Sequence, residues 1–196
     1  MEKKTFIIGI TGGSGSGKTT LLQCIAEKGG LILDCDAIYH QLLTEDPALL
    51  AAIEARFPGV TENGQLQRKK LGKIVFSDEN ALADLNKITH TAVKNEVLRQ
   101  LSAGPKLAAI DAIALFEGDL AGLCDVTVAV TAPLEDRIAR LMARDGISEE
   151  YARTRIAAQR SDASFSALCS HTLVNNGDIC AFRAKCLAFL TEFGIM

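Results

Sequence analysis

The chain has 196 residues, a formal net charge of -3, 48% hydrophobic and 23% charged residues, which suits one globular domain with a sizeable core. Its longest basic run is Arg68-Lys69-Lys70, so the charge pattern of a nucleic-acid binder is missing and we expect no such partner. No stretch approaches the roughly 18 apolar residues of a membrane span, and the apolar run at residues 6–10 is too short for a signal peptide. We therefore expect a cytoplasmic protein without a membrane partner.

The six cysteines contain no Cys-x-x-Cys pair, and several fall within apolar periodic stretches. This usage predicts reduced, buried thiols in a cytosolic protein rather than disulfides. Because no Cys and His residues cluster at ligand spacing, a zinc site is not expected.

The N-terminal part of the chain shows alternating strand and helix patterns. Residues 6–10 are apolar on both faces, as in a central parallel strand. Residues 18–28 have helical apolar spacing, and Gly29-Gly30 ends that helix. Residues 31–33 form a second short strand, after which another helix begins near Ile38.

The middle of the chain is expected to be an all-helical excursion from the sheet. Residues 47–57 have helical spacing, and Pro58-Gly59 and Asn63-Gly64 mark turns. Apolar residues then recur at helical spacing through residues 68–103, until Gly104-Pro105 ends the excursion.

The C-terminal half returns to strands and helices. Residues 107–116 predict a third strand with its exit loop, 126–130 a fourth and 172–174 a fifth, with a closing helix at 179–193. An arginine-rich helix follows the fourth strand, and Ser148 is a candidate N-cap for the next one. This alternation predicts an α/β fold with a five-stranded parallel sheet covered on both faces.

A glycine-rich loop lies between the first strand and the first helix. Gly12, Gly17, Lys18 and Thr19 match G-x-x-x-x-G-K-[ST], the phosphate-binding loop. Glycine permits positive φ and close approach of backbone N–H groups to phosphate. Lys18 supplies a mobile charge for the β- and γ-phosphates, and the Thr19 hydroxyl is suited to bind Mg²⁺. A flexible glycine turn is the structural alternative. The predicted nucleotide-binding residues are Gly12, Gly13, Gly15, Ser16, Gly17, Lys18, Thr19 and Thr20.

The loop alone indicates a nucleoside triphosphate without indicating its use. The chain lacks an N-K-x-D sequence for reading guanine, and its length argues against large motor or transporter ATPases. Asp34 and Asp36 follow the second strand, at the sheet edge where ligands bind in open parallel sheets. Asp36 is a candidate base for a hydroxyl acceptor, which favours a small-molecule kinase. The alternative is that Asp34 or Asp36 caps the following helix.

Further blocks extend these two motifs along nearly the whole chain, and together they resemble dephospho-coenzyme A kinases. The loop T-G-G-x-G-S-G-K-[ST] occupies residues 11–19, and the block D-A-D-x-x-x-H occupies 34–40 with cysteine at its second position. The next two blocks are G-x-L-x-R-x-x-L-x-x-x-I-F at 64–76, with valine at the isoleucine position, and L-L-F-E at 114–117, with alanine first. They are followed by R-x-x-x-R-D at 140–145 with the following Gln159, and by a late N-x-G block at 171–177.

The resemblance implies a three-layer P-loop kinase fold that uses ATP and Mg²⁺ to phosphorylate the ribose 3′-hydroxyl of dephospho-CoA, yielding coenzyme A. It implies one domain over residues 1–196, with a core at about 1–45, 105–135 and 170–196. The helical insertion at about 46–104 would bind the acceptor, and about 140–160 would be a lid. We expect a monomer or small homo-oligomer.

The resemblance also implies roles for individual residues, several of which have a structural alternative. Asp36, Lys18 and Arg140 would be catalytic, and Arg144 could share the clamp on phosphate, although both arginines could also form a solvated face. Arg137 is expected at the surface. Asn175 could border the adenine or form a turn. The expected substrate-binding residues are Asp36, His40, Arg68, His90 and Glu117, of which His90 could instead be a packed histidine.

The sequence departs from the family pattern at four places. Thr91 replaces the proline after His90, and Ile113-Ala114 replaces the proline that usually precedes L-L-F-E. Gly118 follows Glu117, and His171 stands where an acidic residue is usual. These departures bear on the acceptor pocket more than on phosphate chemistry. Two other functions stay open: a nucleoside or nucleotide kinase, which shares the loop and lid, and a non-catalytic nucleotide-binding module, in which Asp36 would be idle.

Overall fold

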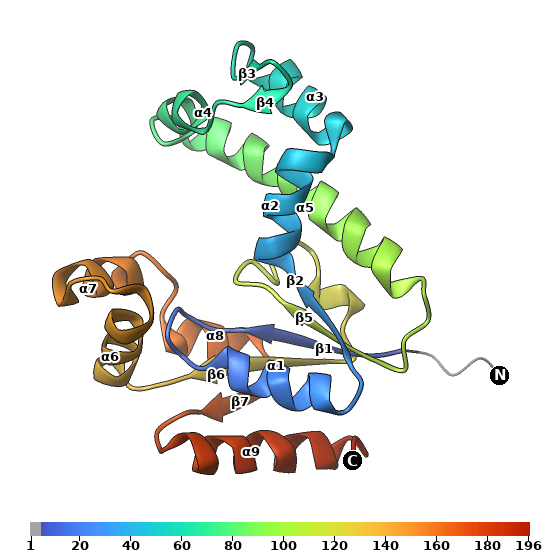
Figure 1. Cartoon of the computed structure of the whole chain (residues 1–196), viewed down its shortest axis with the longest axis vertical. Helices are drawn as coiled ribbons and strands as arrows, with labels where there is room; N and C mark the ends of the chain where they lie inside the picture. The colour runs from blue at the N-terminus through green and yellow to red at the C-terminus, as the bar shows by residue number, and fades with distance from the viewer. Residues whose placement is uncertain (1–4) are drawn as a thin grey trace. The chain divides into compact units, whose positions relative to one another are not determined.

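The structure is a computed structural model that describes residues 5–196 (Figure 1). Its strands are β1 (Phe6–Thr11), β2 (Leu31–Asp34), β3 (Thr61–Glu62), β4 (Gln65–Leu66), β5 (Leu107–Asp111), β6 (Val126–Thr131) and β7 (His171–Val174). Its helices are α1 (Lys18–Glu27), α2 (Cys35–Glu45), α3 (Pro47–Arg56), α4 (Arg68–Val75), α5 (Glu79–Leu101), the 3₁₀ turn η1 (Ala121–Leu123), α6 (Leu134–Asp145), α7 (Glu149–Ala157), α8 (Asp162–Leu168) and α9 (Ile179–Glu192).

These elements form two compact units. The sheet unit contains residues 5–33, 104–116 and 120–196. The helical unit contains residues 34–103 and 117–119. Each unit has its own hydrophobic core.

The sheet has the strand order β2-β5-β1-β6-β7. β1 pairs in parallel with both β5 and β6, and β6 pairs in parallel with β7. Helices α1 and α9 pack against each other and share a hydrophobic core with one face of the sheet (Figure 1). Helix α8 contacts β6. The central strands are apolar because they are covered in this way. The predicted α/β fold with a five-stranded parallel sheet is thus confirmed.

The helical unit differs from the expected all-helical excursion in two details. Asn63 and Gly64 have φ values of 51° and 73°, the left-handed pair that a tight hairpin turn requires, and they join the antiparallel strands β3 and β4. The long helical pattern is interrupted between α4 and α5, where the Asp78 carboxylate accepts hydrogen bonds from the backbone N–H groups of Asn80 and Ala81. Asp78 is therefore an N-cap that begins a new helix.

Cysteine burial matches the prediction only in part. Cys24, Cys35 and Cys186 are buried free thiols, whereas Cys124 and Cys169 are half-buried and Cys180 is exposed. Burial raises the pKa of the Cys186 thiol to about 12, so this side chain stays protonated at neutral pH. Within residues 5–196, no cluster of three or more His, Cys, Asp or Glu side chains could hold a metal ion. None of the helices in the same range is long and apolar enough to cross a bilayer.

Candidate active site

The glycine loop connects the end of β1 to the start of α1 in the sheet unit. Gly12, Gly15 and Gly17 have φ values of 140°, 77° and 101°, a region that disfavours side chains. Gly17 is the N-cap of α1, and it offers no side chain to cap the first N–H groups. The first turn of α1 also carries no acidic residue. The helix therefore presents unsatisfied donors and its positive dipole end to the loop, as an anion site requires.

Side chains from later in the chain hold the carbonyl groups of this loop. The Ser14 carbonyl accepts a hydrogen bond from Arg137 Nε at 2.9 Å, and the Gly15 carbonyl accepts one from Arg140 Nη1 at 3.1 Å. The Ser16 carbonyl accepts one from Asn175 Nδ2 at 2.9 Å. Carbonyl oxygens repel phosphate, so these donors keep three of the loop's carbonyls from facing an anion. The N–H groups of Ser14 and Ser16 are themselves bonded, to Gln159 Oε1 and to the Gly13 carbonyl.

Arg137 corrects the expectation that it lies at the surface. Its side chain is buried, with 4% of the residue exposed, and it forms an ion pair with Asp162 at 2.8 Å. It lies on α6, whose sequence alone resembles a solvated charged face. The partners that bury it are remote in sequence, so helical periodicity could not reveal them.

The same side chains explain why two loop positions need glycine. A Cβ atom at Gly13 would lie 2.1 Å from Arg137 Nη2, and one at Gly17 would lie 2.3 Å from Asn175 Nδ2. Both separations are far below van der Waals contact. The glycines therefore admit the supporting side chains as well as a ligand.

Three polar groups of the loop fit a bound phosphate and its metal. Lys18 Nζ bridges the loop by donating to the Gly12 carbonyl at 2.9 Å. The Ser16 hydroxyl is buried and has no hydrogen-bond partner within the described residues. Thr19 is exposed in the first turn of α1. A buried hydroxyl without a partner is unfavourable unless a ligand supplies one.

Asp34 and Asp36 are separated by their local structure at the start of the helical unit. The Asp34 carboxylate accepts a hydrogen bond from the backbone N–H of Ala37 at 3.0 Å and is the N-cap of α2. Asp36 lies in the first turn of the same helix and is exposed. His40 is exposed one turn further on, so Asp36 and His40 share a side of α2. The capping alternative therefore applies to Asp34 and leaves the Asp36 carboxylate available.

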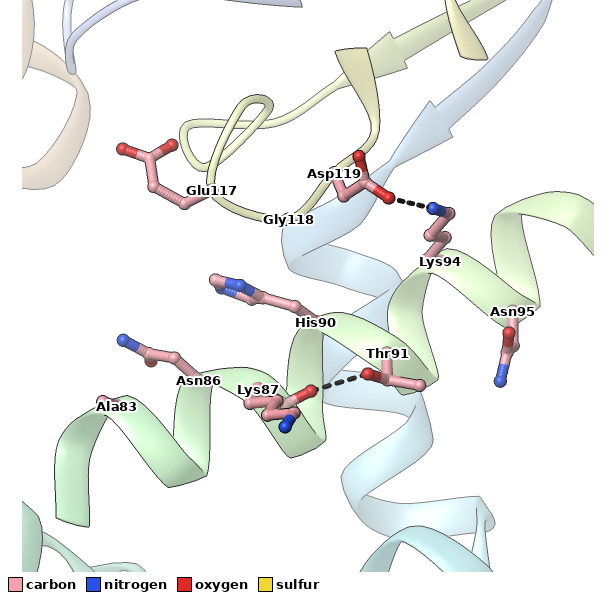
Figure 2. Close-up of a pocket in the computed structure, with 10 residues that line it drawn as sticks. All are labelled: Ala83, Asn86, Lys87, His90, Thr91, Lys94, Asn95, Glu117, Gly118 and Asp119. Atoms are coloured by element: carbon pink, nitrogen blue, oxygen red, sulfur yellow. Dashed lines mark hydrogen bonds and ion pairs between the residues drawn. The ribbon is translucent and has the colours of Figure 1, made fainter. Parts of the chain in front are cut away.

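Two predicted acceptor residues, His90 and Glu117, line one cavity of about 650 Å³ in the helical unit. Figure 2 shows the His90 ring extending from α5 on the same side as Asn86, opposite the 117–119 loop. Lys94 forms an ion pair with Asp119 of that loop. The complete lining is Ala83, Asn86, Lys87, His90, Thr91, Lys94, Asn95, Glu117, Gly118 and Asp119. Lys87 and Lys94 were not predicted from the sequence, although their spacing from His90 places them on adjacent turns of one helix.

Arg68 lies elsewhere in the same unit. It lines a second, smaller cavity of about 250 Å³ with mainly apolar neighbours, among them Tyr39 and Phe76. Burial raises the pKa of the Tyr39 hydroxyl, while the nearby Arg68 charge opposes that shift. Arg68 and His90 thus belong to separate cavities, and neither cavity is lined by Asp36 or His40.

The predicted lid residues have different partners. Arg144 pairs with both carboxylate oxygens of Asp145 rather than with the loop, and Arg155 shares Oδ2 of the same carboxylate. These two guanidinium groups lower the pKa of Asp145 to about 2. Ser148 caps α7 through its hydroxyl, as predicted. Gln159, to which no role had been assigned, contacts the loop at Ser14.

The departures from the family pattern also fall in different places. Thr91 and Gly118 line the larger cavity. The Ile113 carbonyl accepts a hydrogen bond from the Thr11 hydroxyl in the sheet unit. His171 packs its ring against Phe189 and Phe193 of the sheet unit, so this departure serves packing.

Comparison with known proteins gives concordant matches. A family model described as dephospho-CoA kinase matches residues 6–181. Proteins named dephospho-CoA kinase from Carboxydothermus hydrogenoformans and Thermobifida fusca are each 37% identical; the first match covers 95% of this chain and 94% of the relative, and the second covers 87% of each. The solved structure of TT1252 from Thermus thermophilus is 32% identical, with a TM-score of 0.80 over 97% of this chain and 98% of that one. A shikimate kinase from Bacteroides thetaiotaomicron, 16% identical with a TM-score of 0.56 over 96% of this chain and 98% of that one, shares the fold alone.

Proposed function

Since the chain belongs to the dephospho-CoA kinase family, we propose that it transfers the γ-phosphate of ATP to the ribose 3′-hydroxyl of dephospho-CoA, giving coenzyme A and ADP. The observation that carries the proposal is the glycine loop. Arg137, Arg140 and Asn175 engage three of its carbonyls, which keeps these oxygens from opposing an anion at the start of α1. The exposed Asp36 carboxylate supports the second half of the reaction, transfer to a hydroxyl.

The residues of the sheet unit would bind and orient the donor. The loop N–H groups and the start of α1 would hold the phosphates, and the Lys18 ammonium would exchange the Gly12 carbonyl for phosphate oxygen. Arg140 would stabilise charge on the transferring group, for which it must leave the Gly15 carbonyl or bridge to it. Residues of about 140–160 would act as the lid, and excluding water there would prevent hydrolysis of ATP.

Magnesium binding is also part of the proposal. Thr19 is the protein ligand we assign to Mg²⁺, and the ion would neutralise charge developing on the transferred phosphate. Mg²⁺ commonly keeps several waters and needs one or two protein ligands besides substrate phosphates, which fits a single exposed hydroxyl. Asn175 is buried and bonded to the loop, which favours a supporting role for this residue over direct contact with adenine.

The helical unit would bind the acceptor. Asp36 would orient the acceptor hydroxyl and accept its proton, with His40 on the same side of α2. We assign the larger cavity, with His90, Glu117 and Lys87, to the polar part of dephospho-CoA, because it combines hydrogen-bonding groups with a cation. Arg68, on the smaller cavity, is a second candidate for the acceptor phosphates because guanidinium binds phosphate bidentately.

An acceptor screen tests the proposal. ADP release from ATP and Mg²⁺ is measured with dephospho-CoA, with several nucleosides and nucleoside monophosphates, and with no acceptor. We expect turnover above background with dephospho-CoA alone. Turnover with a nucleoside or nucleotide instead would establish the rival kinase function, and ATP binding without turnover on any acceptor would establish a non-catalytic module. A cytoplasmic location and a monomeric or small homo-oligomeric state remain predictions, which fractionation and light scattering would test.

A further inference from the structure

The tip of the glycine loop is hydrogen-bonded to side chains from α6 and from the segment that follows α7. All three polar groups of Ser14 have partners there or on α6. Its backbone N–H donates to Gln159 Oε1 at 2.8 Å, and its hydroxyl accepts from Gln159 Nε2 at 2.8 Å. Its carbonyl accepts from Arg137 Nε at 2.9 Å. Ser14 therefore has little rotational freedom about its peptide groups.

Arg137 and Gln159 are themselves fixed by further contacts. Arg137 Nη1 pairs with Asp162 Oδ1 at 2.8 Å, and Arg137 Nη2 approaches Gln159 Oε1 at 3.4 Å. The other oxygen of Asp162 accepts the backbone N–H of Ala132 at 3.3 Å. The guanidinium thus joins α6, the loop tip and the segment from Gln159 to Asp162. Because it is buried, these hydrogen bonds and the ion pair are little screened by water.

This arrangement has a consequence for phosphate binding. A peptide group that turns its carbonyl toward the ligand side would oppose an anion, so the orientation of the Ser14 peptides affects affinity. The buried Arg137 charge also adds positive potential behind the loop. Neither residue needs to touch the nucleotide to exert these effects, because both act on the loop backbone.

We propose that Arg137 and Gln159 are positioning residues for the nucleotide: they hold Ser14 so that the loop accepts the triphosphate, and they make this affinity depend on the 159–162 segment. The proposal rests on the proposed function for the identity of the nucleotide. It assigns these residues no contact with the acceptor. Their loss should therefore weaken ATP binding selectively.

The test compares Gln159→Ala and Arg137→Lys with the unchanged protein. ATP affinity is measured by calorimetry without an acceptor, and KM is measured for ATP and for dephospho-CoA separately. Gln159→Ala removes two hydrogen bonds to Ser14, so we expect ATP to bind about tenfold more weakly. Arg137→Lys retains the charge but lacks the planar fork, so ATP affinity should also fall, while the dephospho-CoA KM changes less than about twofold in both variants.

Arg183→Gln is the matched control. Arg183 is also an ion-paired arginine of the sheet unit, but it pairs with Glu27 at the end of α1 that is remote from the glycine loop, so its replacement should leave ATP affinity unchanged. Thermal unfolding without ligand identifies a variant that has merely lost stability. The inference would be overturned if Gln159→Ala bound ATP as tightly as the unchanged protein. Equal rises in the KM for ATP and the KM for dephospho-CoA would also overturn it. If the unchanged protein binds ATP but does not phosphorylate dephospho-CoA, the proposed acceptor fails while the calorimetric comparison still decides the inference.

Discussion

Asp34 and Asp36 lie two positions apart and have different environments. Asp34 accepts a helix N–H, whereas Asp36 is exposed beside it in the same turn. The sequence predicted a carboxylate at the end of this strand, but it could not distinguish cap from base. The distinction depends on which carboxylate folds back on the helix, which is a matter of local backbone geometry.

Replacing the two aspartates should therefore affect different properties: catalysis for Asp36 and stability for Asp34. Asp36→Asn keeps the shape but removes the base, so we expect kcat to fall by about 10²- to 10⁴-fold with ATP affinity nearly unchanged. Asp34→Ala removes the cap, so the free energy of unfolding should fall by about 1 kcal/mol while turnover per folded molecule is largely retained. Steady-state kinetics, calorimetry and urea unfolding measure these quantities. Undiminished turnover in Asp36→Asn would remove this residue from the mechanism.

The other site residues differ in how far the sequence could predict them. The loop residues from Gly12 to Thr19 could be predicted because the pattern has a direct backbone explanation. Arg137 and Gln159 could not, because their contacts with Ser14 cross more than a hundred positions of sequence. A charged residue on an amphipathic helix indicates the surface unless its partners are known.

At the scale of elements, the sheet was predictable and the connections within the helical unit were less so. Strands β1, β5 and β6 are short, mainly apolar and largely buried, so hydrophobic patterning located them. Strands β3 and β4 have two residues each, too few for a periodic pattern. The Asn63-Gly64 pair was the available hairpin signal, and it was interpreted only as a turn. The helical pattern of residues 68–103 was interpreted as continuous, although Asp78 is a residue type that often caps the start of a helix.

The α6–α7 pair predicts a specific dependence of stability on pH. Arg144 and Arg155 hold the Asp145 pKa at about 2, below its ordinary 3.8. The folded state thus binds the proton more weakly than the unfolded state, so this carboxylate stabilises the fold above about pH 4 and loses that effect between about pH 4 and pH 2. The melting temperature of Asp145→Asn should be lower than that of the unchanged protein at pH 6, and the gap should close as the pH falls through this range.

High salt provides the control for that experiment. The side chains involved are partly exposed, so added salt should narrow the difference between the two proteins at pH 6. A gap that stays constant down to pH 2 would contradict the assignment of the effect to this carboxylate.

At the scale of the molecule, two hydrophobic cores serve two sets of binding residues. One core lies between the sheet and the α1–α9 pair, and the other joins α2, α3, α4 and α5. The glycine loop belongs to the first unit, and both acceptor cavities belong to the second. Binding of each substrate should thus be detectable in a different unit.

Hydrogen exchange followed by mass spectrometry measures which unit each substrate protects. A ligand at 100 times its dissociation constant stabilises the state that binds it by about 2.7 kcal/mol, which slows exchange that proceeds through opening of the bound structure. ATP should protect peptides containing residues 12–20, and dephospho-CoA should protect peptides containing residues 86–95 and 117–119. Protection of the loop alone by dephospho-CoA would contradict the assignment of the acceptor to the helical unit.

The support beneath the glycine loop also limits how far this motif can be transplanted. Arg137 comes from the helix after β6 and Asn175 from the residue after β7, and each approaches a glycine that has no room for a Cβ atom. A loop copied into another scaffold without these neighbours would keep the sequence motif, but its carbonyls would lack their hydrogen-bond donors. Protein engineers would therefore need to move the exits of three strands together, since the functional unit is a junction of the sheet rather than a string of eight residues.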